Sequence, residues 1–165
     1  MFKQIFLPII LVAAFITLVG LLTQGKFNSF LEKLPVSNNS NLKTIFIDDK
    51  EIKVEVAKTS EEKAKGLSNR EKLDKNSGMI FVFDKDSKPI FWMKDTKIAL
   101  DIVWINDDKV IGVEKNVQPE PGKKDNQLKK YSAPTKIDYV LEVNAGFSDK
   151  NNIKSGSTVQ KLSDL

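Results

Sequence analysis

Lys94, Asp95 and Asp101 bring an amine and two carboxylates together directly after an apolar stretch. Groups of this kind could act as general acid and general base. Charged side chains at exposed strand ends also serve solubility alone, and we favour that interpretation. Asp101 lies between the apolar neighbours Ala99 and Val103 on its face of an expected strand. We therefore expect Asp101 to be buried and paired.

Arg70 is the sole arginine among the 26 basic residues. A guanidinium can bind a carboxylate or phosphate through two parallel hydrogen bonds, which a lysine cannot reproduce. The alternative, which we favour, is an internal ion pair with Asp101 or Glu142.

Trp92 and Trp104 could form a stacking platform for a sugar or a peptide. Large aromatic side chains in strands belong more often to the core, so we favour core positions for both. The case is stronger for Trp104, which shares the regular apolar face of its expected strand with Ile98, Leu100 and Ile102. The candidate ligand-binding residues are Arg70, Trp92, Lys94, Asp95, Asp101 and Tyr131, and no residue is assigned a catalytic role.

Histidine and cysteine are both absent from the sequence. Their absence excludes Ser-His-Asp and Cys-His nucleophilic catalysis and any zinc site built on those residues. The acidic pairs Asp84/Asp86 and Asp107/Asp108 lack the glycine and the downstream glutamate of a calcium loop. We expect no metal and no cofactor.

Residues 5–22 form an apolar run without a charged side chain. A helix of this length spans about 27 Å, close to the hydrocarbon core of a bilayer. We expect residues 1–25 to be a transmembrane anchor or signal segment that contacts the membrane through residues 5–22. Residues 23–25 (Thr-Gln-Gly) match a signal-peptidase site poorly, so we favour a retained anchor over a protein secreted after cleavage.

The formal net charge of +4 divides evenly along the chain. Residues 1–40 hold three lysines and one glutamate, a net charge of +2, which leaves +2 for the remainder. A domain so close to neutral lacks the clustered basic face that nucleic acid requires, so we expect no nucleic-acid partner. The lysines on the two sides of the apolar run nearly balance and do not fix its orientation.

The folded domain is expected to begin at residue 42, after a juxtamembrane segment and polar linker over residues 26–41. A Thr59/Glu62 capping box predicts a helix that ends before Gly66. Alternating apolar residues predict short strands, with polar turns at residues 48–50, 84–89 and 106–108. Six to eight short strands and one helix favour a mainly β fold, a small distorted β-barrel. The expected strands are residues 42–47, 51–57, 79–83, 90–93, 98–105, 109–117, 137–143 and 158–162, and the helix covers residues 60–65.

Residues 117–136 lack periodicity and contain three prolines. Structureless loops of this length are uncommon in compact domains and are usually functional or disordered. This loop is therefore a candidate binding element.

One set of segments forms a specific pattern in this order: 66–67, Arg70, 78–83, 91–96, 100–102, 131–132, 139–146, Ile153 and Gly156. Through these segments, residues 52–159 resemble the prokaryotic domain-of-unknown-function family 192. The resemblance implies a distorted β-barrel with a short helix, often behind an export signal, and it favours a domain outside the cytoplasm. It implies no function. The sequence departs from the family pattern at Ala99, where proline is usual, at Asp95, where asparagine is common, and at Ser157, where aspartate is common.

The leading hypothesis is a membrane-anchored, extracytoplasmic domain of the cell envelope that does not catalyse a reaction. It would bind a small polar ligand or an envelope protein through the 117–136 loop and the rim near Arg70, Lys94 and Asp95. The alternative is a hydrolase or lyase on envelope polymers that uses Asp95 or Asp101 with Lys94. A third hypothesis makes the anchor helix itself the contact with a membrane complex.

Overall fold

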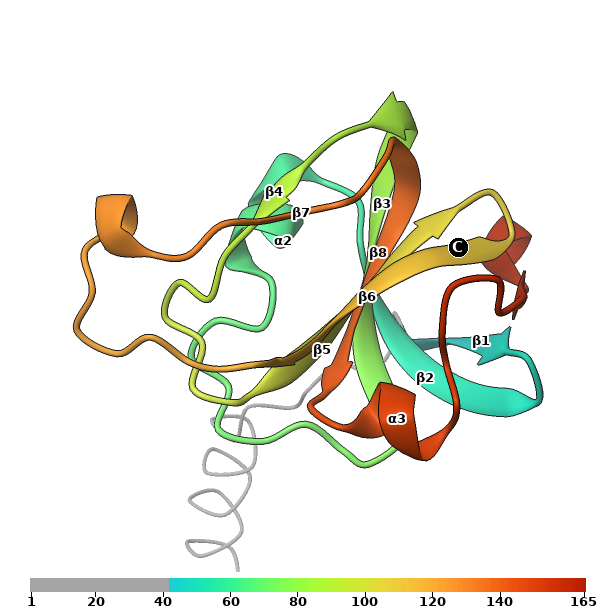
Figure 1. Cartoon of the computed structure of the whole chain (residues 1–165), viewed down its shortest axis with the longest axis horizontal. Helices are drawn as coiled ribbons and strands as arrows, with labels where there is room; N and C mark the ends of the chain where they lie inside the picture. Colours follow the sequence, from blue (N-terminus) through green and yellow to red (C-terminus); the bar gives the residue numbers. More distant parts are fainter. Residues whose placement is uncertain (1–41) are drawn as a thin grey trace, which may run out of the picture. The chain divides into compact units, whose positions relative to one another are not determined.

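The computed structural model describes residues 42–165, which form one mainly β unit (Figure 1). The expected anchor and linker, residues 1–41, lie outside the described residues. No helix in the part from Leu42 onward has the length and apolar character needed to cross a membrane.

A seven-stranded sheet with the strand order β6-β5-β8-β3-β2-β1-β9 forms the framework. All neighbours are antiparallel except β2 and β3, whose parallel pairing requires the crossover that α2 and the following loop supply. The strands are β1 (Leu42–Ile47), β2 (Lys50–Ala57), β3 (Ser77–Ser87), β5 (Leu100–Asn106), β6 (Lys109–Val117), β8 (Ile137–Asn144) and β9 (Val159–Gln160); a separate two-stranded sheet pairs β4 (Ile90–Phe91) with β7 (Tyr131–Ser132). The helices are α2 (Ser60–Lys65) and α3 (Phe147–Lys150), with 3₁₀ turns at Asp125–Gln127 and Leu162–Asp164.

The sheet curls into a half-barrel because its two edges approach each other at one end. An isolated antiparallel bridge joins Lys109 in β6 to Thr158 beside β9. The amide of Val110 donates to the carbonyl of Ser157, and the amide of Val159 donates to that of Asp108. The expected mainly β fold is confirmed in this coarser form of a curled sheet with short helices.

Each face of the curled sheet has its own hydrophobic cluster. The first cluster contains alternate residues of β1, β2, β5 and β8, together with Phe147 of α3 and Ile153. The second contains the intervening residues, such as Ile102 and Trp104 of β5, with Leu67 and Met93 from the segments that cover this face. Both faces of the central strands are therefore buried, and β5 is buried from Leu100 to Ile105.

Local patterns predicted several elements correctly. The α2 capping box is present: the amide of Glu62 donates to the Thr59 hydroxyl, and the Glu62 carboxylate accepts from the Thr59 amide. The β5–β6 hairpin turns at residues 107–108, as expected. The expected turn at residues 84–89 is wrong, because β3 continues to Ser87. The 117–136 segment contains the first 3₁₀ turn and β7, so it is not structureless.

Candidate functional site

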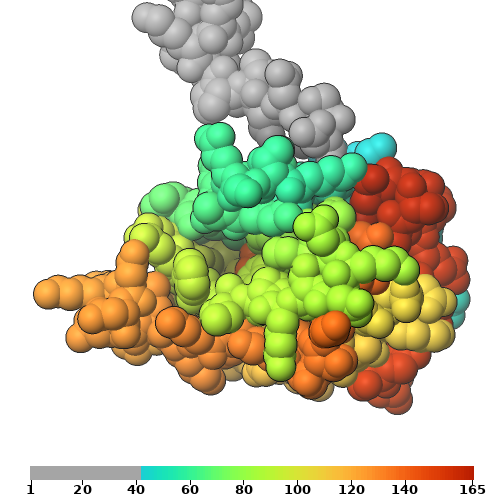
Figure 2. All heavy atoms as spheres, turned by 90° about the horizontal axis from the view of Figure 1, so that it is seen from above, coloured from blue at the N-terminus to red at the C-terminus, as the bar shows by residue number. Residues whose placement is uncertain are grey.

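A pocket of about 260 Å³ opens on the second cluster's face of the sheet. Its sides come from α2 and the residues after it, from the middle of β3, and from the segment 89–96 that contains β4. Figure 2 looks onto this side of the molecule, where the α2 segment and the segment around β4 border a hollow. The volume is near the lower end of the range for small-molecule sites.

The apolar wall of the pocket is a set of phenylalanine rings in edge-to-face contact. The Phe91 ring centroid lies 5.1 Å from that of Phe81 and 6.1 Å from that of Phe83. Phe91 also contacts Trp104 edge-on, which fixes β4 against the second cluster. Its two chain neighbours, Ile90 and Trp92, remain 51% and 47% exposed at the rim. This combination leaves an apolar surface open to solvent beside a rigid wall.

The segments that border the pocket are tied together through backbone groups. The Ser68 hydroxyl donates to the carbonyl of Lys94 at 3.0 Å, and the Asn69 amide donates to the carbonyl of Asp95 at 2.8 Å. The side chain of Asn144, at the end of β8, donates to the carbonyls of Leu73 and Asp74. These bonds hold the loop after α2 over the sheet and position Lys94 at the pocket.

Glu142 of β8 lines the pocket from the sheet side. Its register partners are Met79 in β3 and Ile102 in β5, so apolar side chains flank it on both neighbouring strands. Only 6% of the residue is exposed, and no side chain or amide of residues 42–165 forms a hydrogen bond or ion pair with its carboxyl group. Burial without a compensating partner raises the pKa of Glu142 to about 8. At neutral pH, Glu142 is therefore mainly a neutral carboxylic acid facing the pocket.

The other charged side chains that line the pocket are all lysines: Lys63, Lys65 and Lys94. The Lys63 ammonium lies 4.6 Å from the centroid of the Phe83 ring. Lys94 forms an ion pair with Asp125 of the 3₁₀ turn at 2.5 Å, and this hydrogen bond raises the pKa of Lys94. The pocket thus combines a positive rim, apolar walls and an uncharged acid on the sheet side.

Two of the candidate ligand-binding residues, Trp92 and Lys94, line this pocket. The core position favoured for Trp92 is wrong, because β4 ends at Phe91 and the next side chain turns outward. The core position expected for Trp104 is confirmed. Arg70 forms an internal ion pair, but its partner is Glu55 of β2 and not Asp101 or Glu142.

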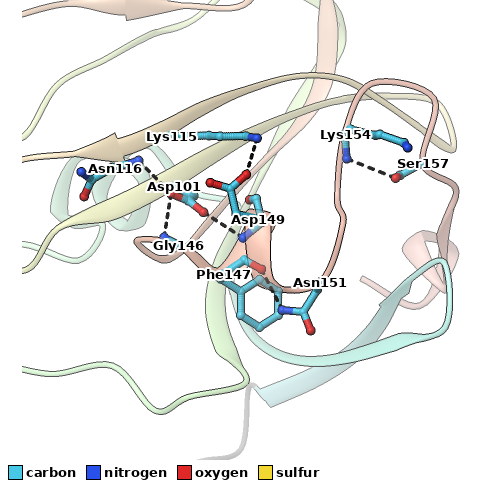
Figure 3. A network of polar contacts seen from close by, with 10 residues as sticks. Asp101, Lys115, Asn116, Gly146, Phe147, Asp149, Asn151, Lys154 and Ser157 are labelled. Atoms are coloured by element: carbon cyan, nitrogen blue, oxygen red, sulfur yellow. Dashed lines mark hydrogen bonds and ion pairs between the residues drawn. The ribbon is translucent and has the colours of Figure 1, made fainter.

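Asp101 is fully buried, as expected, but its partners are backbone amides (Figure 3). One carboxylate oxygen accepts from the amides of Asn116 and Gly146, and the other accepts from the amide of Ser148 at 2.9 Å. Three segments, at the ends of β6 and β8 and the start of α3, are thereby joined around one side chain. Asp101 is a structural anchor that does not reach the pocket.

Comparisons with known proteins place the chain in a family. Residues 43–161 match the model of the family DUF192, described as an uncharacterised ACR. The chain belongs to this family. One solved structure similar to this DUF192 chain is a protein of unknown function from Novosphingobium aromaticivorans DSM 12444. The two sequences are 30% identical, and the structures match with a TM-score of 0.67 over 76% of this chain and 89% of that one.

A second solved structure shares the fold of this DUF192 domain. It is a provisionally named transcription regulator from Sinorhizobium meliloti 1021, 23% identical, with a TM-score of 0.64 over 72% of this chain and 92% of that one. No curated protein matches the chain.

Two further candidate ligand-binding residues, Tyr131 and Asp95, do not line the pocket beside Glu142. Tyr131 is buried in β7, borders a separate polar hollow, and has the Lys129 ammonium 4.6 Å from its ring centroid. Asp95 adopts a positive φ of 53°, a conformation that Asn and Asp accept more readily than most residues. This backbone conformation is a structural reason for an aspartate at position 95.

Sequence reasoning missed Glu142 as a site residue. It lies in the Leu141–Gly146 segment that carries part of the family resemblance. It was considered only as an ion-pair partner for Arg70.

Proposed function

We propose that this DUF192 chain is a non-catalytic ligand-binding domain of the cell envelope. Residues 5–22 would hold it to the membrane as a transmembrane anchor, with the distorted β-barrel domain outside the cytoplasm. Its binding site would be the pocket beside Glu142, which shares Lys94 with the rim that the sequence suggested but is not lined by Arg70 or Asp95.

The observation that supports this proposal is the carboxyl group of Glu142, which is only 6% exposed, has no hydrogen-bond or ion-pair partner within residues 42–165, and faces an open pocket. Burial between Met79 and Ile102 disfavours the charged form of this group, so it is a neutral hydrogen-bonding group at the pocket wall. A ligand that hydrogen-bonds to Glu142 would take the place of solvent there and would bury the exposed apolar surface of Ile90 and Trp92. Ligand binding would then explain why a carboxyl group lies among apolar neighbours at this position.

The carboxylates considered for catalysis support a binding role better than an enzymatic one. Asp101 is fully buried and its oxygens accept three backbone hydrogen bonds. The Asp95 side chain does not line the pocket, and Lys94 is engaged by Asp125. A general acid and base would need to reach the same substrate atom within hydrogen-bond distance. Asp101 does not line the pocket at all, so it could not share a substrate there with Lys94.

Ligand binding is testable with the full chain in lipid nanodiscs against small anions, cations, neutral alcohols, wall fragments and short peptides. Trp92 at the rim should report binding by a change in fluorescence, and Trp92→Phe should remove that signal. A ligand at about 100 times its Kd should add about 2.7 kcal/mol to the free energy of unfolding and raise the midpoint by several degrees. A well-folded chain that responds to none of these compounds would contradict the proposal.

Membrane location is testable because the native sequence contains no cysteine. Ser155→Cys places one thiol at an exposed position. A membrane-impermeant maleimide should label it in intact cells or in cells stripped of their outer layers. Labelling only after lysis would place the domain in the cytoplasm, whereas recovery of a shortened chain from the medium would indicate cleavage and secretion.

A further inference from the structure

The pocket has a chemical preference that goes beyond ligand binding in general. We infer that the ligand of this pocket is a small amphipathic anion, an inference that rests on the proposed function. The anionic group would lie at the rim beside Lys63 and Lys94, and the apolar body would lie against the phenylalanine wall. An inner polar group of the ligand would hydrogen-bond to the carboxyl group of Glu142.

The size of the pocket limits the apolar body. A cavity of about 150 Å³ can hold benzene, so about 260 Å³ accommodates one aromatic ring with a short substituent. The edge-to-face rings of Phe81, Phe83 and Phe91 supply a wall suited to such a ring. The exposed Trp92 lies where it can cover the outer part of the ligand.

The charge around the pocket selects the sign of the ligand. Three lysines line it, and its single acid, Glu142, is buried between strands and mainly neutral at pH 7. No other aspartate or glutamate in the described part of the chain borders the pocket. A cation would meet the lysine ammonium groups with no ionised acid in the pocket lining, whereas an anion would gain attraction at the rim.

Glu142 acts in this arrangement as a hydrogen-bond donor. Its neighbours on β3 and β5, Met79 and Ile102, carry no charge, and the charged groups facing it across the pocket are Lys63, Lys65 and Lys94. In its neutral form the carboxyl group can donate a hydrogen bond to the ligand. Once ionised, it loses that proton and repels an anion. Binding should therefore weaken as the pH rises through about 8.

Asp125 is the internal competitor of the ligand. Its carboxylate already pairs with Lys94, and both side chains are largely exposed, at 72% and 45%. Exposed ion pairs of this kind are weak, so a ligand anion can replace Asp125. Through this contact the 117–136 segment reaches the rim of the pocket.

The test measures Kd by calorimetry on the full chain in nanodiscs with four matched probes. They are para-hydroxyphenylpropanoate, the corresponding propylamine, the corresponding propanol, and phenylpropanoate, which lacks the phenol. We expect the hydroxylated acid to bind at least ~10-fold more tightly than the amine and the alcohol. Loss of the phenol should also weaken binding, because Glu142 then has no partner.

Variants separate the contributions. Lys63→Ala and Lys94→Ala should each weaken binding of the acid several-fold, and Asp125→Asn should strengthen it. Lys150→Ala removes an exposed lysine on α3, outside the pocket lining, and should leave Kd unchanged. Glu142→Gln keeps a neutral donor of similar shape, so it should retain binding at pH 7 and abolish the loss at alkaline pH.

The outcomes distinguish this inference from the proposed function. If the amine or the alcohol binds as tightly as the acid and changes Trp92 fluorescence, the pocket binds ligands but the anionic class is wrong. If Glu142→Gln abolishes amine binding, Glu142 is an ionised cation site and the inference is overturned. If the rim lysine variants leave Kd unchanged, the anion contact is also refuted, independently of whether Glu142 variants fold. Failure of every probe and of the wider panel would overturn the proposed function as well.

Discussion

Arg70 donates two hydrogen bonds to the carboxylate of Glu55, one from each terminal nitrogen and both 2.5 Å long. This pair joins the loop after α2 to β2, at the side of the crossover that makes β2 and β3 parallel. The two side chains are 34% and 36% exposed, so solvent screens their attraction. The sole arginine therefore forms an ion pair within the domain, with Glu55 as its partner.

Replacement of Arg70 by lysine should weaken the fold slightly and leave ligand binding intact. Lysine keeps the charge but cannot form both hydrogen bonds, so we expect a loss of roughly 0.5–1 kcal/mol in the free energy of unfolding. Urea titration of the compact unit Ser40–Leu165 measures this loss. A double-mutant cycle with Glu55→Gln isolates the pair, and a coupling energy near zero would show that the ion pair contributes nothing.

Asp101→Asn should destabilise the domain strongly. An asparagine has one carbonyl oxygen in place of two carboxylate oxygens, so one of the amides of Asn116, Gly146 and Ser148 would face an NH₂ group. We expect a loss of about 2–4 kcal/mol in the free energy of unfolding, measured by urea titration. The neighbouring Asp149→Asn breaks only an exposed pair with Lys115 and should cost under about 0.5 kcal/mol. Equal effects of the two variants would contradict the anchoring role of Asp101.

Glu142 should make the domain less stable as the pH rises. Its pKa is about 8 in the folded state against 4.5 for the free side chain, so between these values the folded state holds a proton that the unfolded state has lost. The contribution of the protonated Glu142 to the free energy of unfolding is fully present below about pH 4.5. It declines by up to about 1.4 kcal/mol per pH unit until about pH 8. Above that pH both states are ionised and the contribution of Glu142 is flat.

Urea titrations at several pH values between about 4.5 and 8.5 measure this slope. Glu142→Gln cannot ionise, so its free energy of unfolding should lack the decline and should exceed that of the native chain at the upper end. If the two proteins show parallel pH profiles, Glu142 is not a neutral buried acid in the folded state.

Gly78→Ala should be among the most damaging small substitutions. A Cβ at this position in β3 would lie 2.5 Å from the carbonyl oxygen of Glu142 and 3.0 Å from a methyl group of Val143. The two strands would have to separate, at a cost of about 2 kcal/mol or more in the free energy of unfolding. Gly112→Ala is the matched control, because its Cβ would have no neighbour closer than 3.4 Å. Calorimetric melting should show a large fall in Tm for the first variant and little change for the second.

The position of Trp92 shows where a local pattern misleads. The apolar run 90–93 predicts a buried strand, but only Ile90 and Phe91 pair with another strand. The partner, β7, is two residues long and comes from the 117–136 segment. Strand length here depends on a partner about 40 residues away, and no local signal in residues 90–93 specifies it.

Glu142 shows a second limit of sequence patterns. Alternation in residues 137–143 places Ile137, Tyr139, Leu141 and Val143 together, which leaves Glu142 on the face that would normally meet solvent. In the structure this face is covered by the loop after α2 and by the segment 89–96. The alternation predicted the strand correctly, but the covering segments decided that Glu142 is buried.

The sequence by itself determined the elements whose signals are local. The alternation in residues 51–57 and 98–105, and the capping box of Thr59 and Glu62, depend on residues within a few positions of each other. Long-range packing places β8 between β5 and β3, brings Arg70 to Glu55, and turns Glu142 toward a pocket with no partner for its carboxyl group among residues 42–165. Those relationships arise from long-range strand pairing and layer packing, which depend on the free energy of the whole fold.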